Sequence, residues 1–173
     1  DVDHRTTAVE QFWKNGILDT ESNIQFGEGG AGTFSDGKLN TLVKDACGRN
    51  HYVLKTFVEA GADPDILYVN KPHIGTDVLR NVVKHIRQEI LSLGGEVRFG
   101  CKVTDLKIKD QQLVGVCVNH TEEIPCEALV LAIGHSARDT FAMLHEHQIL
   151  MQPKSFAVGL RIEHPQSMIN LSQ

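Results

Sequence analysis

Glycines crowd a short stretch in the first quarter of the chain, between residues 27 and 37. Residues 27–32 read Gly-Glu-Gly-Gly-Ala-Gly and satisfy the GxGxxG pattern, in which glycines let the backbone approach a pyrophosphate at the start of a helix. A dinucleotide fingerprint also needs a preceding strand and an acidic residue about twenty positions later. Only residues 24–26 are available for that strand and the acidic residue is missing, so the pattern is weak evidence for a dinucleotide site.

The same stretch overlaps a second phosphate motif. Residues 32–38 match the first seven positions of a P-loop, whose main-chain amides and lysine surround phosphates. Leu39 stands where the P-loop has a Ser or Thr hydroxyl that binds Mg²⁺, which disfavours nucleotide hydrolysis. A surface loop without a ligand is a further alternative. Ser35, Asp36 and Lys38 add polar groups and a cation to the main-chain N–H donors, which favours a polyanionic or flavin ligand.

Several polar side chains are candidates for a role beside such a ligand. Lys38 would stabilise negative charge on a reduced flavin, and the alternative is a solvated lysine. His73 precedes an expected helix start, where an imidazole can donate a proton to a substrate or flavin, although a structural histidine is the preferred interpretation. His135 and Arg138 follow an apolar run and either face phosphates or cap the turn. No catalytic base can be named from the sequence.

Composition narrows the classes of function. The 173 residues carry a net charge of −5 with acids and bases interspersed, so we expect neither nucleic acid nor an anionic membrane surface as a partner. No apolar run reaches the roughly twenty residues of a membrane helix. The four cysteines contain no CxxC pair, which favours a reducing compartment and hence the cytoplasm. No spacing of His, Cys and carboxylates predicts a metal site, and the oligomeric state stays open.

Three helices are expected in the amino-terminal half of the chain. Residues 7–16 hold a capping box, a helical apolar face and a glycine stop, and Trp13 is expected to anchor this helix to the core. Asn50 can cap a second helix over residues 50–61. Residues 76–95 show the clearest helical periodicity, ending in a pair of glycines, and their apolar face is expected to pack on a sheet.

Short strands are expected after that helix. Residues 96–99, 102–108 and 113–118 are rich in Val, Ile and Leu, and a polar turn joins the last two segments. These segments predict a small β-meander.

A continuous apolar run follows over residues 127–133 and ends at Gly134. It is typical of a parallel strand that is covered on both faces and feeds a glycine turn beside a ligand. A helix over residues 137–147 and a further strand over residues 155–163 are expected next.

Five segments of the chain resemble one family, in the same order. They are residues 27–39, 71–77 (Lys-Pro-His-Ile-Gly-Thr-Asp), 94–100, 132–139 (Ala-Ile-Gly-His-Ser-Ala-Arg-Asp) and 156–166. The similar family comprises bacterial uncharacterised FAD-dependent dehydrogenases, which are NAD(P)/FAD-dependent oxidoreductases of the glutathione-reductase-like flavoprotein superfamily. The resemblance covers nearly the whole chain.

This resemblance implies three groups of cofactor-binding residues. One is a glycine-rich loop along the flavin and its pyrophosphate, one is a strand whose valine backbone contacts the adenine, and one is a buried strand that turns on a glycine. Small residues at that turn let the backbone lie close to the cofactor. The implied residues are Gly29, Gly30, Ser35, Asp36, Gly37 and Lys38 in the loop, Val103 on the strand, and Ala132, Ile133 and Gly134 at the turn.

The resemblance also implies an α/β fold and an internal fragment. Residues 1–150 would form a partial Rossmann-like FAD/NAD(P)-binding domain with a β-meander, with the first βαβ unit missing, and residues 151–173 would begin a substrate domain. The parent protein would be an FAD-dependent oxidoreductase or dehydrogenase of unknown substrate, with NAD(P)H as a candidate electron donor, and the isolated fragment is expected to be inactive. The alternatives are a non-catalytic flavin- or nucleotide-binding module and a P-loop nucleotide-binding protein.

Overall fold

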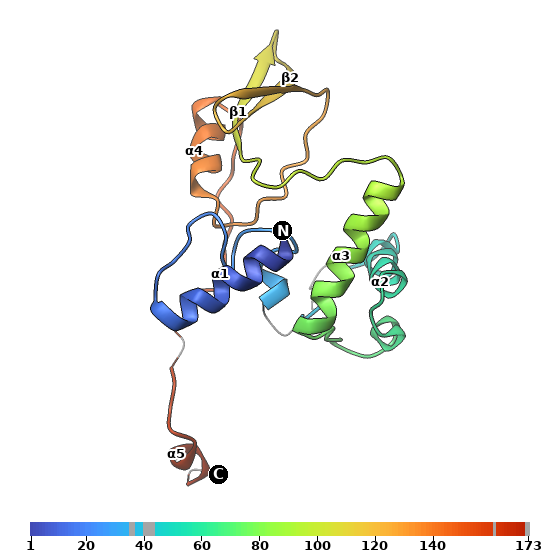
Figure 1. Ribbon diagram of the computed structural model, residues 1–173, viewed down its shortest axis with the longest axis vertical. Coiled ribbons are helices and arrows are strands. Elements are labelled where there is room, and N and C mark those ends of the chain that lie inside the picture. Colours follow the sequence, from blue (N-terminus) through green and yellow to red (C-terminus); the bar gives the residue numbers. More distant parts are fainter. Residues whose placement is uncertain (35–36, 40–43, 161, 172–173) are drawn as a thin grey trace.

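The computed structural model describes residues 1–34, 37–39, 44–160 and 162–171. Figure 1 shows two groups of elements, one helical and one built on a small sheet. The helical group contains α1 (Val2–Asn15), the 3₁₀ helix η1 (Ala31–Phe34), α2 (Arg49–Glu59), the 3₁₀ helix η2 (Pro64–Leu67) and α3 (Thr76–Ser92). The sheet group contains β1 (Val103–Lys109), β2 (Gln112–Val118), β3 (Glu122–Pro125) and α4 (Arg138–Glu146), and α5 (Gln166–Asn170) lies apart from both.

Helix α1 begins earlier than the capping box at Thr7 predicts. The carboxylate of Asp1 accepts hydrogen bonds from the N–H groups of Asp3 and His4, at 2.9 and 2.8 Å, and thereby caps the helix. Gly16 ends it in the left-handed conformation, as expected. The expectation that Trp13 anchors the helix is wrong, because that side chain is 71% exposed. The last turn of α1 points away from α3 (Figure 1), and the ring of Trp13 contacts that of its neighbour Phe12, with centroids 5.6 Å apart.

Helices α2 and α3 pack against each other and η2. Asp45 caps α2 in place of Asn50, since its carboxylate accepts hydrogen bonds from the first N–H groups of the helix. The apolar face of α3 does not pack on a sheet, contrary to expectation: Leu79 and Val82 are buried against Ile66 of η2 and the end of α2. This core is built from elements adjacent in sequence. None of the described helices is long and apolar enough to cross a membrane.

The sheet is a three-stranded antiparallel meander in the order β1-β2-β3, which confirms the expected β-meander. Asp110 and Gln111 form the turn between β1 and β2, and both have left-handed φ angles, of 50° and 62°. Such angles fit a two-residue hairpin turn that follows the strand twist. The strand expected over residues 96–99 is absent, and those residues are a connection to β1.

Helix α4 covers one face of this sheet and confirms the helix expected over residues 137–147. Met143 and Leu144 of α4 are buried with Leu106, Val116 and Val118 of the strands. The two groups therefore have separate cores. The side chains of His147 and Asp105 meet at 2.6 Å and join the end of α4 to β1.

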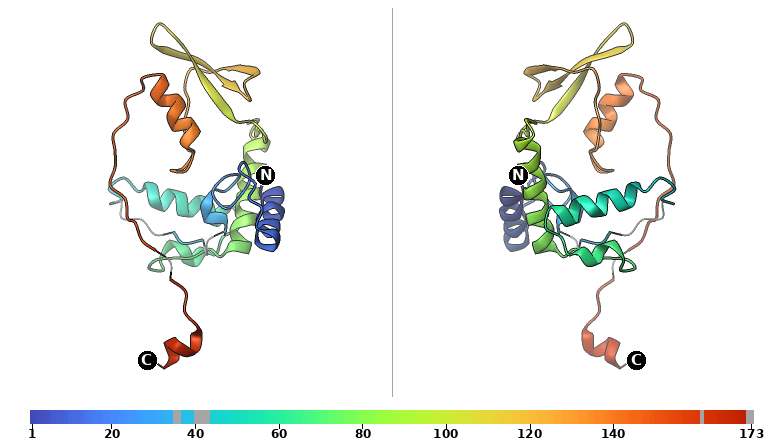
Figure 2. Two further views of the ribbon diagram at one scale, coloured as in Figure 1. Left: turned by 90° about the vertical axis from the view of Figure 1, so that its left-hand side faces the viewer. Right: turned by 90° about the vertical axis from the view of Figure 1, so that its right-hand side faces the viewer.

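Two apolar runs that predicted strands are extended but form no strand. They are residues 127–133 and, among its described positions, the segment 155–163. Val130 is 88% exposed and Leu160 is 92% exposed. A covered strand needs hydrogen-bonded neighbours, and no described residue pairs with either run, so both predictions are wrong for this structure. Figure 2 shows the second run as a long extended segment that leads away to α5.

Candidate functional site

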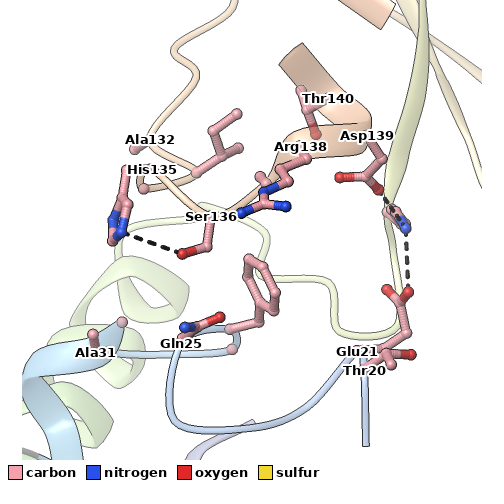
Figure 3. A pocket seen from close by; sticks show the side chains of 18 residues that line it. Thr20, Glu21, Gln25, Ala31, Ala132, His135, Ser136, Arg138, Asp139 and Thr140 are labelled. Carbon is pink, nitrogen blue, oxygen red and sulfur yellow. Dashed lines mark hydrogen bonds and ion pairs between the residues drawn. The ribbon is translucent and has the colours of Figure 1, made fainter. Parts of the chain in front are cut away.

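A cavity of about 710 Å³ lies where the helical group meets the sheet group. Two segments far apart in sequence form most of its wall: residues 20–31, which precede and include the start of η1, and residues 132–140, which lead into α4. Figure 3 shows Gln25 and Ala31 on one side and Ala132 to Thr140 on the other. The cavity therefore joins the glycine-rich loop to the turn after the apolar run.

Half of the sequence-predicted site residues meet in this cavity. They are Gly29, Gly30, Ala132, Ile133 and Gly134. Val103 is not part of the wall: it is half-buried against the sheet core, while its neighbour Lys102 lines the cavity. Ser35 and Asp36 lie outside the described residues.

Gly37 and Lys38 lie elsewhere, paired with the segment that leads into α3. Lys38 forms an isolated antiparallel bridge with His73, and the N–H of Ile74 donates to the carbonyl of Gly37 at 3.1 Å. The N–H of Leu39 donates to the carbonyl of Pro72 at 3.0 Å. A P-loop lysine would open a helix, whereas Lys38 lies in an extended pairing, so the P-loop alternative is not favoured.

The glycine-rich loop is supported from behind by Arg5 of α1. Its guanidinium is fully buried and donates hydrogen bonds to the carbonyls of Asn23, Ile24 and Glu28, at 2.7, 2.7 and 2.8 Å. Sequence reasoning missed this residue. The available signal was a charged side chain at position 5 between apolar positions 2 and 9, on what becomes the buried face of a helix.

Two glycines of the wall have room for a ligand. Gly30 and Gly134 have φ angles of 65° and 71°, and a Cβ added at either would meet no atom within 4 Å. A group that lies against the main chain at these two points would occupy the space that a side chain would otherwise fill. The cavity wall is thus suited to close approach of a flat or chain-like ligand.

A cation held by two carboxylates borders the cavity. The ammonium of Lys102 lies 2.6 Å from a carboxylate oxygen of Asp139 and 3.2 Å from one of Glu21 (Figure 3). The hydrogen bonds with Asp139 and Glu21 raise the pKa of Lys102, and the hydrogen bond from Lys102 lowers the pKa of Asp139. These two ion pairs link the loop that carries Glu21 to the start of α4. No sequence motif predicted them.

The start of α4 adds groups that favour negative charge. His135, Ser136 and Arg138 line the cavity just before and within its first turn. Arg138 extends toward the loop that carries Gln25 (Figure 3). A guanidinium is a favourable partner for phosphate oxygens, whereas the N–H of Arg138 itself donates to the carbonyl of Ser136 at 2.9 Å. The described residues include no group of three His, Cys, Asp or Glu that could hold a metal ion.

Comparison with known proteins identifies the family. Residues 79–171, more than half of the chain, match the model of the FAD dependent oxidoreductase family. The chain belongs to this family. The matched range includes residues 132–140 of the cavity wall, and FAD is the cofactor of the family.

An uncharacterized protein from Clostridium beijerinckii is 56% identical to this chain over all 173 residues. The alignment covers 32% of that protein, so the chain spans about a third of the length of the curated relative it matches.

The residues of the cavity fit FAD. Gly30 and Gly134 leave room along the main chain, and the guanidinium of Arg138 suits a phosphate. FAD requires close main-chain approach for its flat ring system and a cationic partner for its phosphates, and the two glycines and Arg138 meet these requirements.

Proposed function

We propose that this chain forms part of the FAD site of a dehydrogenase in the glutathione-reductase-like superfamily. The observation that carries the proposal is the cavity that joins Gly29 and Gly30 to residues 132–140, because both walls combine small residues with polar groups. The chain's membership of an FAD-dependent family supports the same conclusion. The whole protein would exchange electrons or a hydride with a small-molecule substrate in the cytoplasm, and NAD(P)H is the candidate donor.

FAD, when bound, supplies the redox chemistry, and the chain supplies position and electrostatics. Gly30 and Gly134 would let the main chain lie against the cofactor, since neither carries a side chain that fills the space. The guanidinium of Arg138 would bind phosphate oxygens. Val103 would contact the adenine through its main chain, as the resemblance implies, and Lys102 beside it would help to orient this end of the site.

The domain organisation is part of the same proposal. Residues 1–150 would belong to a Rossmann-like FAD-binding domain, and residues 151–173 would begin a substrate domain. The exposed runs support this organisation, because Val130 and Leu160 are apolar side chains with almost no cover from the described residues. Other parts of a longer protein would provide the neighbouring strands for both runs.

A series of glycine substitutions tests the site. Gly30→Ala and Gly134→Ala each place a methyl group in the cavity wall, at φ angles of 65° and 71°. Gly48→Ala is the matched control, since Gly48 has a φ of 70°, also faces open space and begins α2 away from the cavity. All three variants carry the same kind of backbone strain, of about 1–2 kcal/mol.

The measurement is FAD affinity of the full-length protein, followed by quenching of flavin fluorescence. Gly30→Ala and Gly134→Ala are expected to weaken binding about tenfold, because an extra methyl group overpacks a close contact. Gly48→Ala is expected to lower stability equally and leave affinity unchanged. Equal affinity for all three variants would refute this location. Tight FAD binding without reduction by NAD(P)H or any other donor would instead favour a non-catalytic flavin module.

A further inference from the structure

The guanidinium of Arg5 donates three hydrogen bonds to the main chain of residues 23–28. Its Nε donates to the carbonyl of Asn23, and its two terminal nitrogens donate to the carbonyls of Ile24 and Glu28. These acceptors lie 18 to 23 residues further along the chain. One side chain therefore fixes both ends of the segment that leads into Gly29.

Packing alone does not explain an arginine at this position. Its side chain is completely buried, and burial lowers the pKa of Arg5 to about 10, so the charge is retained at neutral pH. The hydrogen-bond acceptors are neutral carbonyls, which offset the desolvation of a cation less than a carboxylate would. An apolar side chain of similar volume would fill the space but leave the carbonyls of Asn23, Ile24 and Glu28 without these donors. The feature that only arginine supplies is a rigid fork of donors.

The stem of Arg5 touches the loop as well. A Cβ at Gly27 would lie 2.7 Å from Cδ of Arg5, so the main chain of Gly27 rests directly on that stem. Gly27 also lines the cavity. Arg5 thus lies immediately behind the wall, with its guanidinium 4.7 Å from the centre of the Phe34 ring.

The neighbouring residues hold the segment in the same position. The side-chain oxygen of Asn23 accepts from the N–H groups of Gln25 and Phe26, which closes the turn before Gly27. The carboxylate of Glu28 accepts from the N–H of Val2 at 2.8 Å and from Arg87 at 3.0 Å. The segment is therefore tied to both α1 and α3, with Arg5 at its centre.

We propose that Arg5 is a positioning residue for the flavin pocket, which holds residues 23–28 in their ligand-binding geometry before FAD arrives. This inference rests on the proposed function. A loop that is already ordered loses less conformational entropy on binding, so affinity rises without any contact between Arg5 and the ligand.

The test compares Arg5→Lys with Arg80→Lys in the full-length protein. Lysine keeps the charge and most of the stem but lacks the fork. Arg80 is the matched control because it stacks on the same Phe34 ring, at 5.1 Å, and its described ion pair is with Asp77 of its own helix. Fluorescence titration is expected to show FAD binding weakened about tenfold by Arg5→Lys and less than about threefold by Arg80→Lys. Equal affinities for both variants and the unchanged protein would overturn the proposal.

Hydrogen exchange of the unchanged protein gives a second readout that does not depend on whether the variants fold. The N–H groups of Asn23, Gln25 and Phe26 are hydrogen-bonded within the turn. We expect them to be protected without FAD nearly as strongly as with FAD. Protection that develops only after FAD binds would overturn the proposal. If the unchanged protein bound no FAD, the proposed function itself would fail. If the unchanged protein and both variants bound FAD with the same affinity, only the role of Arg5 would be removed.

Discussion

The core between α2 and α3 and the apolar run over residues 127–133 contain similar side chains in opposite environments. Val82 of α3 has no exposed surface, whereas Val130 is 88% exposed. The helical core finds its buried partners in elements that follow one another in the chain, from the end of α2 through η2 to α3. The run over residues 127–133 has no described strand beside it. Two apolar side chains of the same type are therefore buried or exposed according to whether the described residues supply elements that pack on them.

The sharpest way to break this comparison is to place a carboxylate at both valines. Val82→Asp buries an uncompensated charge and is expected to cost about 3–5 kcal/mol of unfolding free energy in the 173-residue chain. Val130→Asp is expected to change it by less than about 0.5 kcal/mol there. Urea unfolding followed by circular dichroism measures both. The same Val130→Asp variant in the full-length protein should be severely destabilised if other strands cover this run; equal effects of the two variants in the short chain would contradict the comparison.

A smaller effect should separate the two cores. Leu144→Ala removes a buried side chain between α4 and the sheet and is expected to cost about 2–4 kcal/mol locally. Because α3 packs in a different cluster, amide hydrogens of β1 and α4 should exchange faster while those of α3 keep their rates. Val114→Ala is the control, since that side chain is 46% exposed on β2. Acceleration in α3 of the same size would show that the cores unfold together.

Acidification should weaken the link between α4 and β1. The hydrogen bond from His147 holds the pKa of Asp105 below its ordinary value of 3.8. This contribution is therefore present above pH 3.8 and is lost as the pH falls through the lower, folded-state pKa. The pair is partly exposed, so Asp105→Asn is expected to cost below about 1 kcal/mol at pH 6. The difference in Tm between the unchanged protein and Asp105→Asn should shrink below pH 3.8. A difference that grows there would contradict a stabilising role for the ionised Asp105 carboxylate.

The smallest effect is expected at the surface of the sheet. Lys107 and Glu123 pair at 2.7 Å, but both side chains are exposed. Lys107→Ala is expected to change the unfolding free energy by no more than about 0.5 kcal/mol. Urea unfolding in low salt and in about 0.5 M NaCl measures this change, since the higher salt concentration screens exposed charges. A larger loss in low salt that disappears in high salt would mean that ion pairs, rather than the contact with α4, stabilise the meander.

The elements that the sequence predicted correctly are those specified by neighbouring residues. Helical periodicity located α2, α3 and α4, and a polar turn between apolar segments located the hairpin of β1 and β2. The start of α1 was misplaced because the box at Thr7 lies inside a helix that Asp1 caps. The run over residues 127–133 was misjudged because a covered strand depends on partners that no local pattern encodes.

The candidate site divides in the same way. Gly30 and Gly134 were predicted from motifs, and the structure brings them to one cavity. Gly37 and Lys38 were assigned to the same loop but pair with the segment before α3, since sequence adjacency does not fix the path of the chain after η1. Arg5 escaped detection because its partners are carbonyl groups, which are present at every position and leave no signature in the residue types.

The turn at Asp110 and Gln111 has a kinetic consequence. It places the first strand pair of the meander only two residues apart in sequence, with every later pairing built outward from that point. Hairpins of this kind close in roughly 1–10 μs, far faster than contacts between distant segments. During synthesis, β1 to β3 can therefore assemble as soon as they emerge, and the joining of the two cavity walls, which are about a hundred residues apart, should be the slow step that completes the site.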